Sequence, residues 1–205
     1  MREVRAHALL APMCNDYEQH VRHAAFRKAI AALELAAGDD TALVAADDVR
    51  IGDSGPVLRA AGNGVELVAM PFGFPPPRPK AGPVFNFKSD GRDFSDSRRC
   101  VIVLSGFFEF TGTKYPKTKH RLALRDSEVM GIAGLWSTDE DGALSFTMLT
   151  TAPGPDIAPI HNRQVCVLRP EDWAAWLFLS RPQAELLAPL PEGTLVVAVV
   201  REGSE

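Results

Sequence analysis

Cysteine is scarce in this chain of 205 residues, which contains only Cys14, Cys100 and Cys166. A small and odd number of cysteines does not build a disulfide framework, and these three lack the close paired spacing of a zinc site. No apolar run approaches the roughly 18 residues of a membrane-spanning helix. The first apolar segment is short and is broken by His7 and Pro12, unlike a signal peptide. We therefore expect a cytoplasmic protein without membrane segments, metal or cofactor.

Positive charge is also in deficit, with 22 Lys and Arg against 26 Asp and Glu and a formal net charge of −4. The deficit is uneven. Residues 78–121 contain ten basic and four acidic residues, whereas the rest of the chain contains twelve basic and twenty-two acidic ones. A basic middle in an acidic protein is typical of a polyanion site, although a solvated basic face would give the same count.

The remaining composition is that of a globular protein, 46% hydrophobic and 23% charged, and the length suits one domain. Short apolar runs predict strands over residues 100–104, 107–110, 121–124, 129–135, 144–150, 164–168 and 195–200. Asn63-Gly64, between two further apolar runs, predicts a hairpin, and the Pro-rich residues 71–83 predict a loop. Helical spacing predicts helices over residues 16–37, 170–179 and 182–187, the first capped by Asp16. Together these elements indicate a mostly β, α+β single domain.

Cys14 directly follows Met13. If synthesis began at Met13, removal of the methionine would leave an α-amino group and a thiol on one residue. The amine of such an aminothiol can form a Schiff base with an aldehyde, and the thiol can then close a thiazolidine ring. A buried structural cysteine is the alternative interpretation.

Three further residues could support chemistry. Glu109 lies among phenylalanines, where burial would raise the pKa of a carboxyl group and suit proton transfer. His161 lies in a turn-rich segment beside Arg163, which suits phosphate or hydroxyl binding. Asn86 stands between two phenylalanines and is followed by Lys88, a combination that suits stacking on bases and holding phosphates. Each of these could instead be an ordinary strand or loop residue.

The ordered set of motifs resembles the SRAP family (SOS response-associated peptidase), whose members form DNA–protein crosslinks at abasic sites. The motifs that carry the resemblance are residues 13–15, 70–75, 86–90, 98–100, 106–110, 134–136, 149–151, 160–163, 172–173 and 176–177. The resemblance implies an α+β fold with a β-rich, barrel-like, mostly antiparallel core and flanking helices. It also implies a domain over residues 13–205, and residues 1–12 would be an extension that is absent or removed in the active form.

The resemblance further implies a role for each matching residue. Cys14, made amino-terminal, would capture the aldehyde of an abasic site, with Asn86 positioning it, Glu109 as acid and base, and His161 at the sugar hydroxyl or phosphate. The positions implied to contact DNA are Lys88, Arg98, Arg99, Phe110 and Arg163. The implied partner is single-stranded DNA containing abasic sites, and we expect a monomer with a lyase-like Schiff-base step and self-removal of the extension.

The chain departs from the family pattern in several places. Asn15-Asp16 replaces the usual Gly-Arg, Phe72 replaces a Trp, and Lys88 replaces an Arg and so loses bidentate phosphate geometry. Two other functions remain open. In a cysteine peptidase, His161 would be the base for Cys14 and Glu109 its orienting acid. A plain single-stranded DNA-binding module would form only complexes that denaturant dissolves.

Overall fold

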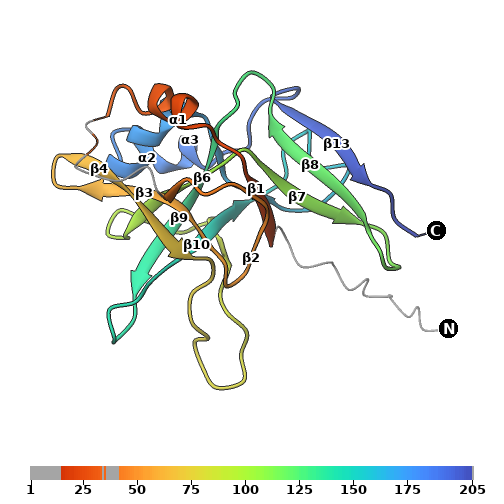
Figure 1. Ribbon diagram of the computed structural model, residues 1–205, viewed down its shortest axis with the longest axis horizontal. Helices are drawn as coiled ribbons and strands as arrows, with labels where there is room; N and C mark the ends of the chain where they lie inside the picture. Colours follow the sequence, from red (N-terminus) through yellow and green to blue (C-terminus); the bar gives the residue numbers. More distant parts are fainter. Residues whose placement is uncertain (1–14, 34, 36–41, 205) are drawn as a thin grey trace.

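Two β-sheets and three short α-helices make up the part of the chain that the computed structural model describes, residues 15–33, 35 and 42–204 (Figure 1). Cys14 and the predicted extension 1–12 lie outside the described residues. Within the described part, no helix is both long and apolar enough to cross a membrane.

Sheet A contains five antiparallel strands in the order β13-β8-β7-β1-β2. Its strands are β1 (Asp16–Gln19), β2 (Ala46–Arg50), β7 (Gly106–Thr111), β8 (Thr118–Leu124) and β13 (Leu195–Arg201). Although β1 begins the described chain, it lies inside the sheet, where Tyr17 pairs with Val49 of β2 and Phe107 of β7. Sheet A therefore contains both β1, near the start of the described chain, and β13, near its end.

The prediction of a helix over residues 16–37 is wrong at its start. Residues 16–19 form β1, and the α-helix α1 (His23–Ala29) begins only after Arg22. The apolar residues that seemed to share one helical period serve two different cores: Tyr17 is buried between the sheets, and Phe26 is buried beneath the helices. Pairing with β2 and β7 makes residues 16–19 a strand, and this pairing cannot be predicted from the local sequence pattern.

Sheet B has eight strands, six of them in the order β11-β10-β9-β6-β3-β4. These six are β3 (Ser54–Ala61), β4 (Gly64–Pro71), β6 (Arg99–Leu104), β9 (Met130–Thr138), β10 (Leu144–Thr151) and β11 (Gln164–Val165). The strand β12 (Val167–Leu168) pairs with β9, and β5 (Asn86–Lys88) pairs with β10 in parallel. The predicted hairpin is present, but its two-residue turn is Gly62-Asn63, because Gly64 already pairs with Ala61.

The two sheets face each other across an apolar core. Alternate residues of each strand point inward, so Phe107 and Leu122 of sheet A join Ile102 and Phe146 of sheet B in one buried cluster. The strand orders of both sheets end at free edges, so the core is barrel-like but open. This confirms the predicted β-rich, mostly antiparallel α+β class.

The helices cover the other face of sheet B, at the upper left of Figure 1. The segment 170–179 forms the 3-10 turn η2 (Pro170–Asp172) and α2 (Trp173–Phe178), and 182–187 contains α3 (Gln183–Leu186). Trp176 is fully buried, and its indole N–H donates to the carbonyl of Cys100 at 2.8 Å. That bond fixes α2 on β6.

Candidate functional site

Four of the predicted site residues meet at the carboxyl end of β10. In the parallel pairing of β5 with β10, Asn86 lies opposite Met148 and Lys88 opposite Thr150. The guanidinium of Arg163 donates to the carbonyl oxygen of Thr150 at 2.9 Å, and His161 precedes it by two residues. Since Met148 belongs to the core between the sheets, its pairing partner Asn86 also lies on the inner side of sheet B.

Arg163 ties this cluster together. Its Nη1 lies 2.6 Å from a carboxylate oxygen of Asp90, while its Nη2 holds the carbonyl and hydroxyl of Thr150. The hydrogen bond from Arg163 holds the pKa of Asp90 below its usual range. Ser89 adds a second anchor, since its hydroxyl also donates to the Thr150 carbonyl at 2.9 Å. The segment 86–90 is thus fastened to β10 by charge-assisted and neutral bonds.

His161 presents one ring nitrogen to the backbone and the other to the interior. Its Nδ1 lies 3.1 Å from the N–H and 3.0 Å from the carbonyl oxygen of Arg163, so either tautomer finds a partner there. Its Nε2 is buried and has no hydrogen-bond partner among the residues that the structure describes. A buried imidazole nitrogen of this kind can accept a hydrogen bond from a bound molecule or donate one to it, depending on the tautomer.

Glu109 lies on the opposing sheet. It shares the inner face of β7 with Phe107, and only 1% of its surface is exposed. The ladder between β1 and β7 pairs Tyr17 with Phe107 and Glu18 with Gly106. The described chain therefore enters sheet A, just after Asn15, on the strand next to the one that carries Glu109.

Aromatic rings connect the two halves of the candidate site. The ring of Tyr17 in β1 meets the edge of Phe72 at 6.0 Å between centroids, and Phe72 stacks on Phe146 of β10 at 5.0 Å. Phe85, the residue before Asn86, meets the same Phe72 ring at 6.4 Å. These contacts fix the start of β1 relative to the segment that carries Asn86.

A cleft of about 500 Å³ opens at the outer side of the start of β1. It is lined by Asn15, Asp16, Asp48, Arg50, Ile51, Phe110, Tyr115, Lys117, Lys119 and Arg201. Phe110, one of the positions that the resemblance implies to contact DNA, and the exposed Tyr115 contribute aromatic rings to this cleft. Lys119 is committed to the protein, since it forms ion pairs with Asp16 and Asp48. Burial and the neighbouring Asp48 raise the pKa of Asp16 to about 6, against the opposing effect of Lys119.

Arg98 and Arg99 lie away from the part of β10 that pairs with Asn86 and Lys88 of β5. Arg98 stacks over Trp136 and donates to Thr138, which pairs with Leu144 at the beginning of β10. Arg99 donates to five backbone carbonyls, among them those of the α2 residues Trp176 and Leu177. Because its donors are used inside the protein, we leave Arg99 out of the candidate DNA contacts.

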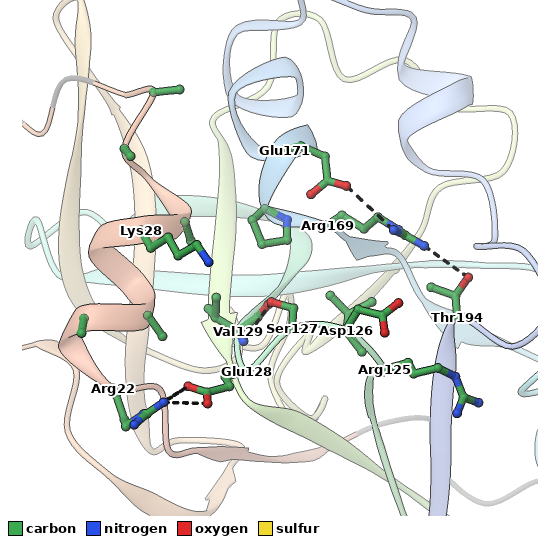
Figure 2. Close-up of a pocket in the computed structure, with 17 residues that line it drawn as sticks. Arg22, Lys28, Arg125, Asp126, Ser127, Glu128, Val129, Arg169, Glu171 and Thr194 are labelled. Carbon is green, nitrogen blue, oxygen red and sulfur yellow. Dashed lines mark hydrogen bonds and ion pairs between the residues drawn. The ribbon is translucent and has the colours of Figure 1, made fainter.

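A second and larger cleft contains none of the predicted site residues. It measures about 860 Å³ and lies between α1, the β8–β9 connection and η2 (Figure 2). Its charged side chains are mostly paired with one another: Arg22 binds Glu128 at 2.5 Å, and Arg169 lies near Glu171 and Thr194. Mutual pairing of this kind leaves little net charge for a polyanion, so size alone does not make this cleft the functional site.

The two described cysteines are buried thiols. Burial raises the pKa of Cys166 to about 12 and that of Cys100 further still. Thiols with raised pKa values are poor nucleophiles, so Cys14 is the cysteine left for chemistry. Among residues 15–33, 35 and 42–204, no group of three or more His, Cys, Asp or Glu side chains is arranged to hold a metal ion.

A sequence profile of the family described as SOS response associated peptidase (SRAP) matches residues 13–203. The chain belongs to the SRAP family. It is 32% identical over 89 residues to the abasic site processing protein YMR114C of Saccharomyces cerevisiae, an alignment that covers 42% of this chain and 24% of that protein. It is 36% identical over 87 residues to the abasic site processing protein YoqW of Bacillus subtilis, covering 40% and 38%. The aligned segments thus span well under two thirds of either relative.

Solved structures agree with the SRAP assignment at the level of the fold. A crystal structure of a Bacteroides thetaiotaomicron protein superposes with a TM-score of 0.70 at 18% identity and covers 92% of each chain. A Bordetella bronchiseptica protein gives 0.66 at 23% identity, covering 92% of this chain and all of that one. Identities this low establish the shared fold and nothing further.

Proposed function

We propose that this SRAP protein processes abasic sites in DNA and captures them covalently through Cys14. The observation that carries the proposal is that Asn86 lies on the inner side of sheet B, which faces the sheet of Glu109, and that the buried Nε2 of His161 lies two residues before Arg163, which binds the end of β10. The names of the curated relatives, abasic site processing proteins, support the same substrate. The roles that we propose for these residues are those that the resemblance implies.

The capture consists of two balanced steps. The free α-amino group of Cys14 condenses with the aldehyde of a ring-opened abasic sugar, which forms a C=N bond and releases one water. The thiol then adds across that bond, so that sulfur binds carbon and the thiol proton moves to nitrogen. The buried carboxyl of Glu109 would carry protons in both steps, and Nε2 of His161 would hold a sugar hydroxyl or phosphate oxygen.

The chemistry requires a free amine on Cys14. Twelve residues precede Met13 in the sequence. Either synthesis from Met13 followed by methionine removal, or hydrolysis of the Met13–Cys14 peptide bond, would supply this amine. Hydrolysis of the Met13–Cys14 bond would be a peptidase activity of the protein on itself, with His161 as the base.

Single-stranded DNA is the partner that the surface favours. The cleft beside β1 combines the Phe110 and Tyr115 rings with the cationic Lys117 and Arg50, a combination that stacks on splayed bases and follows phosphates. Lys88 is exposed at the opposite sheet, next to the Asn86 cluster. We keep Lys88 and Phe110 as DNA contacts, and we assign Arg163 to positioning His161 and Asn86.

The test uses protein made from Met13, with loss of the methionine verified by intact mass. Incubation with a single-stranded oligonucleotide containing one abasic site should give a band of lower mobility on a denaturing gel. Cys14→Ala should give none, and neither should an oligonucleotide whose abasic analogue lacks the aldehyde. Cys166→Ala is the matched cysteine control and should keep the band.

Two results would overturn the proposal: no band with the protein that begins at Cys14, or an undiminished band with Cys14→Ala. Protein made from Met1 separates the two routes to the amine. A fall in its mass that requires His161 would support self-cleavage, and an unchanged mass would assign the amine to synthesis from Met13.

A further inference from the structure

The strand β13 forms an open edge of sheet A. It pairs with β8 alone, and Figure 1 shows it as the outermost strand of this sheet. Its exposed side chains are valines: Val196 and Val197 are 38% exposed, and Val199 and Val200 are 50% exposed. Natural edge strands usually carry charges or proline against association, and residues 195–200 contain neither.

The backbone at this edge has unused hydrogen-bonding groups. Arg125 N–H donates to the carbonyl of Thr194, and in an antiparallel ladder this bond directs the polar groups of Val196 and Ala198 toward β8. The N–H and carbonyl groups of Val197 and Val199 therefore point away from β8. No residue of the described part of the chain pairs with them.

At both ends of β13, the backbone N–H groups have hydrogen-bond partners within the protein. The carboxylate of Asp156 accepts from the N–H groups of Gly193 and Leu195, before the open part. Beyond it, Gly203 and Ser204 are bonded back to Thr118 and Pro116. The open part is thus short and centred on Ala198.

The sequence around Ala198 is symmetric: residues 196–200 read Val-Val-Ala-Val-Val in both directions. We infer that β13 is a homodimer interface, in which the β13 strands of two copies pair antiparallel about a twofold axis at Ala198. This proposal is independent of the proposed DNA chemistry. It replaces our expectation of a monomer, which came from the sequence.

The twofold register uses all of the open groups. Val197 lies opposite Val199 of the second copy, and Val199 lies opposite Val197 of the second copy. Each of these two pairs exchanges both of its backbone hydrogen bonds, so four bonds join the copies. Val196 lies opposite Val200 of the second copy, and every cross-strand pair from 196 to 200 is Val with Val or Ala with Ala.

The charge distribution along β13 also favours pairing with a second copy of the chain over pairing with a charged partner. The central pairs bring no like charges together. The same register carries the exposed Glu202 toward Thr194 of the second copy, and the guanidinium of Arg125 lies beside Thr194, where it donates to the carbonyl of Gly193 at 2.8 Å. Opposite charges therefore approach at both rims of the dimer. The contact is one strand wide, below the roughly 1,200–2,000 Å² of a standard interface, so we expect micromolar affinity.

The first measurement is the mass of the whole chain as a function of concentration, by analytical ultracentrifugation. We expect a rise from 22.2 kDa toward twice that value between about 1 and about 500 µM. A mass that stays at 22.2 kDa over this range would overturn the proposal and leave the edge to a different protein strand.

The second measurement tests the register with a disulfide. Ala198→Cys, in a Cys14→Ser background, places two cysteines directly opposite each other at the axis, in a close non-hydrogen-bonded pair. Mild oxidation should give a disulfide dimer on a non-reducing gel. Val196→Cys is the matched control and should give none, because its counterpart lies four residues away along the strand. Equal crosslinking of the two variants, or none with Ala198→Cys, would contradict the proposed axis.

The third measurement exchanges charges. Val197→Lys with Val199→Lys places lysine opposite lysine in both pairs and should weaken the dimer at least about tenfold. Val197→Glu with Val199→Lys places glutamate opposite lysine and should restore association. Val44→Lys, at a valine 68% exposed outside the sheets, should leave the dimer unchanged. Equal behaviour of the two double variants would show that another surface joins the copies.

Discussion

The hydroxyl group of Tyr17 lies against Gly55 of β3, where no side chain intervenes. A Cβ atom at position 55 would lie 1.8 Å from the Tyr17 hydroxyl oxygen. Tyr17 is fully buried, and it is the residue of β1 that reaches the Phe72 ring. Gly55 therefore makes room for the Tyr17 side chain between the sheets and helps to fix the position of β1 in sheet A.

Gly55→Ala should disturb both stability and chemistry. The added methyl group must displace Tyr17, an overpacking that costs about 1–3 kcal/mol of unfolding free energy. We expect a lower urea midpoint together with slower crosslinking to abasic DNA. Gly82→Ala is the control, since a Cβ there meets nothing within 4 Å. Wild-type stability and rate in Gly55→Ala would contradict the role of Tyr17 in placing β1.

At the scale of elements, β1 is unusual in burying acidic side chains on a strand. Asp16 lies 3.1 Å from the ammonium of Lys119, and Glu18 accepts from the guanidinium of Arg121 at 2.8 Å and from Ser105. Burial opposes ionisation of Glu18, but Arg121 and Ser105 more than compensate and hold its pKa below the ordinary value. Ionised Glu18 therefore stabilises the contact between β1 and β8.

Glu18→Gln should remove a pH-dependent part of the stability. A lowered pKa in the folded state gives stability that is present above the ordinary glutamate pKa of about 4.3 and is lost as the pH falls through the folded-state value. We expect the variant to be about 1 kcal/mol less stable at neutral pH. The difference should shrink below about pH 4. Urea unfolding across pH measures it, with the exposed Glu140→Gln as control; a gap that grows toward acid pH would contradict this assignment.

The strands of sheet B were predictable because their apolar runs are short, continuous and bounded by turn residues, as in residues 100–104. The start of β1 was not predictable, because Asp16 and Glu18 look like the polar face of a helix until Lys119 and Arg121 are placed beside them. Motifs identified Asn86, Glu109 and His161 as a set. They did not reveal the structural use of Arg99 or the importance of Asp90 and Thr150, since these depend on hydrogen bonds between distant segments.

For the whole molecule, the basic excess of residues 78–121 is a poor measure of the field that DNA would meet. Lys119 and Arg121 are paired with carboxylates, and Arg99 is held by backbone carbonyls. Exposed cations such as Lys88 and the partly exposed Lys117 remain. Lys88 lies in β5 of sheet B and Lys117 directly precedes β8 of sheet A, so in the proposed complex they would hold a single strand from two sides of the candidate site.

Salt should weaken non-covalent binding of Cys14→Ala to single-stranded DNA. Each lysine that neutralises a phosphate contributes about 0.7 to the slope of log affinity against log salt. We expect Lys88→Ala with Lys117→Ala to reduce the slope by about twice that amount. Lys28→Ala, in the other cleft, should not change it. Fluorescence anisotropy at several salt concentrations measures the slope, and a salt-independent affinity for the parent would exclude a phosphate-binding surface.

The inner position of β1 has a consequence for biosynthesis. Its partner Phe107 is made 90 residues after Tyr17, and β8 must follow before the ion pairs of β1 can form. β1 can pair with β2 early, but it gains its other neighbour and its ion pairs only after β7 and β8 have been made. A truncated product that ends before β7 would carry Cys14 but would lack Glu109. Capture of an aldehyde in the proposed site would thus require a chain that extends at least through His161.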